Sequence, residues 1–257
     1  MNWTSRRLLR IAAPFCLGSL VFAGQSGGTE PATPESTKAV TSAEAVTADG
    51  ADQPERESVA SADAMPDLEA KGWVSLFNGK DLSGWSQKNG TATYRVEDGV
   101  IIGKTAEGSP NSFMCSEQDY GDFELTFEVA VDPGLNSGVQ IRSVSKSAFK
   151  NGRVHGPQVE IESAPGESGY LYSEGTGRGW ITKEQAIKDA YQNDQWNRFV
   201  VRAKGDRLQT WVNGRAIADI RDPESSMNGF IGLQVHSIKK GSGPYEVRWR
   251  DIRVREL

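Results

Sequence analysis

The first feature that could carry chemistry is a run of polar side chains at every second position. Gln158, Glu160 and Glu162 alternate with the aliphatic residues Val159 and Ile161. Because successive side chains of a strand point to opposite faces, the three polar groups are expected on one face, with the two carboxylates about 7 Å apart. Such a face is either a solvated strand edge or part of a polar binding site.

Two other segments repeat this pattern. Asn136, Gln140 and Arg142 occupy alternate positions in one, and Gln234 and His236 do so in the other. Three separate solvent faces with this mixture of amide, carboxyl, guanidinium and imidazole groups would be unusual. We therefore expect one sheet to bring the three segments together as the lining of a groove.

A loop rich in glycine and aromatic residues follows the first segment, and it contains Tyr170, Tyr172, Glu174 and Trp180. Flat rings with a polar edge are suited to stacking on sugar faces. The expected ligand is therefore a small carbohydrate.

Each of these residues also has a structural interpretation. Arg142 could pair with Glu160 or Glu162, because ion-pair networks are common without function. His236, taken alone, is more often a hydrogen-bonded structural imidazole than a base.

The rest of the domain predicts the scaffold that positions these residues. Short alternating segments are separated by turn residues such as Asn213-Gly214 and Asp132-Pro133-Gly134. Many short strands at near-even spacing predict an all-β fold, an antiparallel two-sheet jelly-roll sandwich. One short helix is expected at Lys183–Tyr191.

The chain divides into three parts. Residues 1–23 combine arginines with a short apolar core, which predicts a signal peptide, including a weak twin-arginine pattern, and therefore a periplasmic or extracellular protein. Residues 24–66 hold eight acids and two bases without an aromatic residue, which predicts a disordered acidic linker. Residues 67–257 form the expected globular domain, and Cys115 is its one thiol.

Composition argues against several partners. The whole chain has a net charge of −5 and no basic stripe, so nucleic acid is not an expected partner. After signal removal no apolar run is long enough for a stable transmembrane segment. Motifs for phosphoryl transfer, nucleotide redox chemistry or zinc peptidases are absent from the sequence. The oligomeric state stays open.

Ordered motifs give the sequence a family likeness. They begin with Leu76-Phe77-Asn78-Gly79-Lys80-Asp81-Leu82, continue through Asn136-Ser137-Gly138-Val139 and Gly232-Leu233-Gln234-Val235-His236, and end at Trp249-Arg250-Asp251-Ile252-Arg253. Together they resemble the 3-keto-disaccharide hydrolase family, over residues 72–257. The resemblance implies a concanavalin-like sandwich and a sugar whose 3-hydroxyl is already oxidised. One departure is Gln158-Val159-Glu160-Ile161-Glu162, where many members have Glu-x-Gln before an Asp.

The 3-ketone implied by this resemblance defines the chemistry. It acidifies the C2 hydrogen, so that a base can remove it, the C1 oxygen can leave, and water can add. Glu160 or His236 is the expected base, and Arg142 with Gln234 would support the enolate oxygen. Glu162 or a tyrosine hydroxyl would serve as the proton donor.

Several alternatives remain at this point. A divalent cation such as Ca²⁺ or Mg²⁺ could replace Arg142 as the electrophile. A conventional two-carboxylate glycosidase would use Glu160 and Glu162 directly. A non-catalytic carbohydrate-binding module is the third interpretation, because the same fold hosts lectins.

Overall fold

The computed structural model describes residues 64–257. The predicted signal peptide and nearly all of the predicted linker lie outside this part of the chain. Within it, every regular element is a β-strand.

The first sheet has eight strands, in the order β13-β12-β11-β6-β15-β4-β3, with β1 paired to β15. All of its pairings are antiparallel. The strands are β1 (Val74–Ser75), β3 (Thr93–Glu97), β4 (Val100–Lys104), β6 (Phe123–Val131), β11 (Asn197–Lys204), β12 (Arg207–Val212), β13 (Arg215–Arg221) and β15 (Glu246–Glu256).

The second sheet has seven strands, in the order β10-β9-β8-β7-β14-β5-β2. It is also antiparallel throughout. Its strands are β2 (Trp85–Lys88), β5 (Ser112–Tyr120), β7 (Asn136–Ser143), β8 (Gly156–Glu162), β9 (Leu171–Glu174), β10 (Gly179–Trp180) and β14 (Gly229–Val235).

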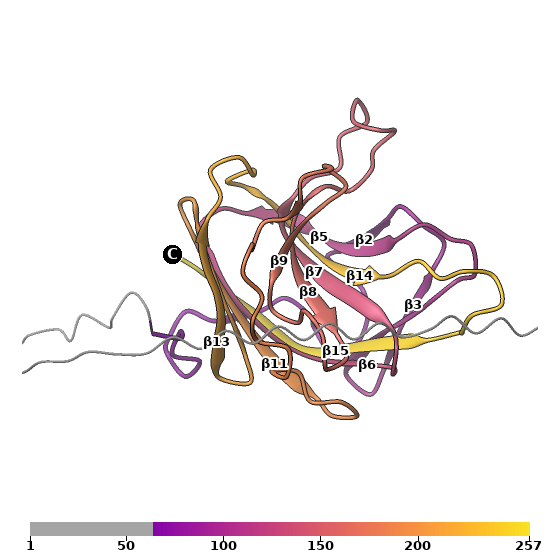
Figure 1. Ribbon diagram of the computed structural model, residues 1–257, viewed down its shortest axis with the longest axis horizontal. Helices are drawn as coiled ribbons and strands as arrows, with labels where there is room; N and C mark the ends of the chain where they lie inside the picture. Colours follow the sequence, from indigo (N-terminus) through magenta and orange to yellow (C-terminus); the bar gives the residue numbers. More distant parts are fainter. Residues whose placement is uncertain (1–63) are drawn as a thin grey trace, which may run out of the picture. The chain divides into compact units, whose positions relative to one another are not determined.

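The two sheets pack face to face around one hydrophobic core (Figure 1). Val139 of β7 and Val159 of β8 are fully buried there, beside the stacked rings of Phe127 and Phe199 from the first sheet, whose centroids lie 5.2 Å apart. Alternation then sends the polar residues of β7 and β8 to the outer face of the second sheet. The predicted two-sheet sandwich is confirmed.

The predicted helix at Lys183–Tyr191 is wrong, since residues 64–257 contain no helix. This segment instead uses its polar groups in contacts with the core. The Ile187 amide donates to the Tyr170 hydroxyl at 2.8 Å, and the Tyr191 hydroxyl accepts from the Val131 amide at 2.9 Å. These tertiary hydrogen bonds outweigh the local helix propensity. The described residues also hold no helix that is long and apolar enough to cross a membrane.

A β-bulge interrupts the alternation near the end of β7. Gln140 lies opposite Gly232 and Ser143 opposite Phe230, so β7 has one residue more than β14 in this interval. Arg142 occupies it with a φ of 47°, in the left-handed region. The residue that returns to the outer face is therefore Ser143 rather than Arg142.

Candidate active site

A buried amide and carboxyl network lies on the outer face of the second sheet, where β8, β7 and β14 are neighbours. Its end point is Glu160, whose side chain is only 5% exposed. The Asn136 amide donates to Oε1 of Glu160, and the Gln158 amide donates to Oε2 at 2.9 Å. Two neutral N–H donors thus hold the carboxylate in one orientation.

The network continues behind Gln158. Oε1 of Gln158 accepts from the Gln234 amide at 2.9 Å and from the Gln140 amide. Gln140 in turn accepts from the Ser143 hydroxyl at 2.7 Å. Each N–H or O–H group in this series of hydrogen bonds therefore donates in the direction of Glu160.

Gly138 makes room for this arrangement. A Cβ atom at this position would lie 2.5 Å from Cδ of Gln158, closer than side-chain contacts allow. The glycine in β7 is therefore needed for Gln158 to lie flat across the sheet.

Burial raises the pKa of Glu160 to about 7. The hydrogen bonds from Gln158 and Asn136 oppose this by stabilising the charged form, and the nearby Glu162 and Glu174 carboxylates raise the pKa further. A carboxylate that titrates near neutrality is suited to general-base catalysis.

The network borders a hollow of about 260 Å³. Eight of the twelve predicted site residues line it, from five neighbouring strands, the two-residue strand β10 included, and from the residue that follows β14. They are Asn136, Gln158, Glu160, Tyr172, Glu174, Trp180, Gln234 and His236.

An aromatic pair forms one wall. Tyr172 of β9 and Trp180 of β10 are cross-strand partners, and their rings meet edge to face with centroids 5.3 Å apart. Both side chains remain partly exposed. A half-exposed ring beside buried amides offers the combination of stacking and hydrogen bonding that sugars require.

His236 and Glu174 also line the hollow. Nδ1 of His236 lies 2.8 Å from the carbonyl oxygen of Ser237, so this nitrogen carries the proton. Nε2 is then an acceptor in the neutral ring and a donor in the imidazolium form. Glu174 pairs with Arg153 at 3.1 Å.

Arg142 is not part of this site, which corrects the sequence prediction. The bulge turns its guanidinium away, and Nε donates to the Gly121 carbonyl at 2.6 Å while Nη2 pairs with Asp122 at 2.8 Å. Nη1 donates to the carbonyl of Gly205 at 2.5 Å. The side chain is 2% exposed and joins loops at one end of the sandwich.

Three further predicted residues do not line the hollow. Gln140 is fully buried behind Gln158. Tyr170 belongs to the core, where its hydroxyl accepts the Ile187 amide. Glu162 lies at the end of β8, and its carboxylate accepts the backbone amide of Glu167 at 3.1 Å. The Glu160 and Glu162 pair of a conventional glycosidase is therefore not assembled in this hollow.

Sequence reasoning missed two supporting residues. Ser143 enters the network only because of the bulge, and no periodic pattern shows a bulge in advance. Arg153 reaches Glu174 from the loop between β7 and β8. Loop residues carry no alternation signal, so only the folded structure identifies them.

The described residues contain no group of three or more His, Cys, Asp or Glu side chains arranged to hold a metal ion. Asn136 and Gln158 instead direct their N–H groups at Glu160, and such donors do not bind cations. The donor set therefore does not fit the divalent cation considered from the sequence.

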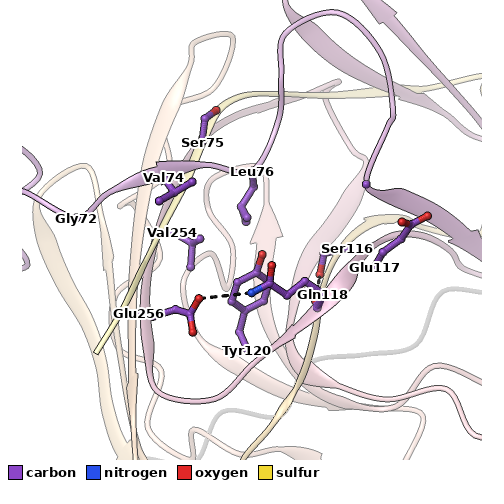
Figure 2. A pocket seen from close by; sticks show the side chains of 11 residues that line it. Gly72, Val74, Ser75, Leu76, Ser116, Glu117, Gln118, Tyr120, Val254 and Glu256 are labelled. Atoms are coloured by element: carbon purple, nitrogen blue, oxygen red, sulfur yellow. Dashed lines mark hydrogen bonds between the residues drawn. The ribbon is translucent and has the colours of Figure 1, made fainter.

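A larger hollow of about 620 Å³ lies elsewhere, between β1, β15 and β5. Figure 2 shows Tyr120 within it and Gln118 hydrogen-bonded to Glu256 across it. Glu117 and Glu256 are its only ionisable carboxyl groups, and both are exposed. It lacks the buried network found around Glu160.

Solved structures with this architecture come from carbohydrate-related proteins. A candidate glycosyl hydrolase of Parabacteroides distasonis is 20% identical, covers 72% of this chain and 94% of its own, and has a TM-score of 0.54. The β-glucanase of Bacillus licheniformis is 11% identical over 72% and 97% of the chains, with a TM-score of 0.53. The carbohydrate-binding module CBM66 of Bacillus subtilis is 19% identical over 67% and 96%, with a TM-score of 0.50.

At these identities the likeness establishes the fold alone. No protein with a curated description is significantly similar in sequence. Residues 72–255 nevertheless match one family along nearly the whole domain, in agreement with the resemblance seen in the motifs. The chain belongs to the family of 3-keto-α-glucoside-1,2-lyase-like domains.

Proposed function

We propose that this protein is an enzyme that cleaves 3-keto-glycosides, with Glu160 as the general base. The observation that carries the proposal is the state of Glu160: a buried carboxylate, oriented by two amides, with a pKa raised to about 7. A base that is partly deprotonated at neutral pH matches the removal of a proton from carbon next to a ketone.

The proposed reaction has two stages, an elimination and then an addition of water. Glu160 takes the proton from C2, and the electron pair forms an enolate between C2 and C3. Its collapse creates a C1–C2 double bond and expels the C1 oxygen, which takes a proton. Water adds its hydroxyl to C1 and a proton to C2, so the products are a free 3-keto sugar and an alcohol.

Two residues of the hollow are placed to complete the proton transfers. The imidazolium form of His236 or the hydroxyl of Tyr172 can protonate the leaving oxygen. The Gln234 amide already donates to Gln158, and its Oε1 is buried without a hydrogen-bond partner. In this orientation Gln234 supports the hydrogen-bond network that holds Glu160.

A lectin-like module is the second candidate, and one observation favours it. No lysine or arginine is among the described residues that line the hollow, so an enolate would rely on neutral donors and on His236. A site that only binds sugar has no such requirement.

The test is incubation of the purified protein with a 3-keto-glucoside and with its unoxidised counterpart, in D₂O. We expect sugar release from the ketone only, with one deuterium at C2 of the product, and neither event in Glu160→Gln. Binding without turnover would support the lectin, and cleavage of the unoxidised glycoside would support a conventional glycosidase.

We also propose that the protein acts outside the cytoplasm, in the periplasm or beyond. The support is the signal-like pattern of residues 1–23, which combines arginines with a short apolar core. Cell fractionation with a C-terminally tagged full chain tests this. A cytoplasmic, unprocessed product would contradict it.

A further inference from the structure

Two more hollows share walls with the one at Glu160. The first, of about 460 Å³, has Glu174 and His236 in common with it. The second, of about 410 Å³, has Trp180 in common with it. Each of these three side chains therefore separates two neighbouring hollows rather than closing off the site.

The hollows follow one another across the sheet. The 460 Å³ hollow is bounded by Asn89, which follows β2, and by Asn111, which precedes β5. The 410 Å³ hollow lies beyond the opposite edge strand β10, beside residues 221–224. The strands from β14 to β10, which supply the central hollow, cover four strand spacings, or about 19 Å, and the flanking hollows reach residues outside them.

The central hollow alone is small for a complete ligand, since binding pockets usually hold about 300–1,000 Å³. At about 260 Å³ it suits one ring, whereas the flanking hollows of about 460 and 410 Å³ are each large enough for at least one more. A ring bound at Glu160 would then have substituents extending in both directions.

The flanking hollows carry groups that bind hydroxyls. One is lined by amides, by Lys150 and by Arg153, and the loop that supplies these two residues projects at the top of Figure 1. The other is lined by Arg178 and Lys183 beside Trp180. Trp180 is partly exposed and borders both the central hollow and the 410 Å³ hollow, so its ring can stack on a sugar bound where the two meet.

We infer that the substrate is a carbohydrate chain of at least three rings, bound across the second sheet with its central ring at Glu160. This inference rests on the proposed function, because it takes the central hollow as the catalytic one. It assigns the two flanking hollows to neighbouring sugar units.

The experiment measures binding as a function of chain length. Glu160→Gln is titrated calorimetrically with α-1,4-, β-1,4- and β-1,3-linked gluco-oligosaccharides of one to five units and with their 3-keto forms. In at least one series we expect the Kd to fall about tenfold with each unit up to three, and then to level off. Equal affinity for one and three units in every series, or no binding, would overturn the inference.

Variants locate the contribution of each hollow. Lys150→Ala and Lys183→Ala, each at a lining residue of one flanking hollow, should weaken binding of the three-unit ligand about fivefold and leave one-unit binding unchanged. Lys204→Ala, an exposed lysine of the other sheet, is the matched control and should change neither. Weakening of one-unit and three-unit binding by the same factor would contradict separate subsites.

The two proposals fail in different ways. If no 3-keto-glycoside of one to five units is cleaved but affinity rises with length, the proposed reaction is wrong and the groove stands. If 3-keto-disaccharides are cleaved with the same kcat/KM as longer chains, and affinity does not depend on length, the reaction stands and the groove is wrong.

Discussion

Glu160 and Glu124 are almost equally buried, 5% and 2% exposed, on the outer faces of the two sheets. Glu124 is held by two cations, because Arg202 donates to it at 2.8 Å and Arg255 at 2.9 Å. Glu160 receives only the neutral amides of Asn136 and Gln158. The two carboxylates are therefore alike in burial and differ in their partners, which are cations around Glu124 and neutral amides around Glu160.

The same contrast holds for the faces around them. On the first sheet the guanidinium carbon of Arg250 lies 4.1 Å from the centroid of the Trp196 ring, and Arg250 pairs with Glu128 at 2.6 Å. These contacts cover the surface with paired charges and an aromatic ring. On the second sheet the aromatic pair of Tyr172 and Trp180 borders a hollow instead. Both faces carry alternating polar residues, but of the two buried carboxylates only Glu160 lines one of the hollows described above.

The largest expected effect is the loss of activity in Glu160→Gln. Removing the general base should lower kcat by about 10³-fold, while the amide keeps the shape of the network. Turnover of a 3-keto-glucoside measures this. Glu124→Gln is the control, and an equal loss in both variants would erase the distinction between the two carboxylates.

The pH dependence of activity and of stability should also distinguish Glu160 from Glu124. Because Glu160 must be deprotonated to act, kcat/KM should rise with pH and level off above about 7. The folded state binds the Glu160 proton more tightly than the unfolded chain does, since the ordinary pKa is 4.5. Its contribution to stability is therefore greatest at low pH and falls by about 3 kcal/mol as the pH rises from about 4.5 to 7.

Unfolding by urea at several pH values measures this linkage. In Glu160→Gln the decline attributable to this residue should vanish, while it should persist in Glu124→Gln. A pH–rate profile without an inflection between about 6 and 8 would contradict the role of Glu160 as the titrating base.

Arg142→Met tests whether this arginine supports the structure or the reaction. Its guanidinium bonds to the Gly121 and Gly205 carbonyls and to Asp122, so its loss should reduce the free energy of unfolding by about 3 kcal/mol. The kcat of the folded fraction should stay unchanged. A large loss of kcat with normal stability would place Arg142 in the catalytic site instead.

Glu124→Gln should have a smaller effect on stability. It leaves two arginines with a weaker partner, but these side chains are 17% and 21% exposed and remain partly hydrated. We expect a loss of about 2 kcal/mol in the free energy of unfolding, measured with urea at pH 7. Unchanged stability would mean that the arginine pairs contribute little.

The smallest effect is expected from Gly138→Ala. The added methyl group would displace Gln158 and so remove a hydrogen bond that lowers the pKa of Glu160. The inflection of the pH–rate profile should move upward, and kcat/KM at pH 7 should fall about tenfold. Gly121→Ala is the control, because its Cβ would meet nothing closer than 3.8 Å.

Alternation predicted much of this architecture. It placed Gln158 and Glu160 on one face of β8 and Gln234 on the matching face of β14, and the sheet order makes these strands near neighbours. It could not predict β10, a strand of two residues, because two positions show no period. It also could not give the register that sets Arg202 opposite Glu124, since pairing is decided by contacts distant in sequence.

The one extra residue in the β7 bulge reverses which side chains of this strand lie on the outer face of the sheet. Before it, the even-numbered side chains lie on the outer face of the sheet, and after it the odd-numbered Ser143 does. Relatives that lack this insertion should present the residue aligned with Arg142 to the hollow. When β7 is compared with a strand that lacks the bulge, the residues after Arg142 correspond in space to positions shifted by one in the sequence.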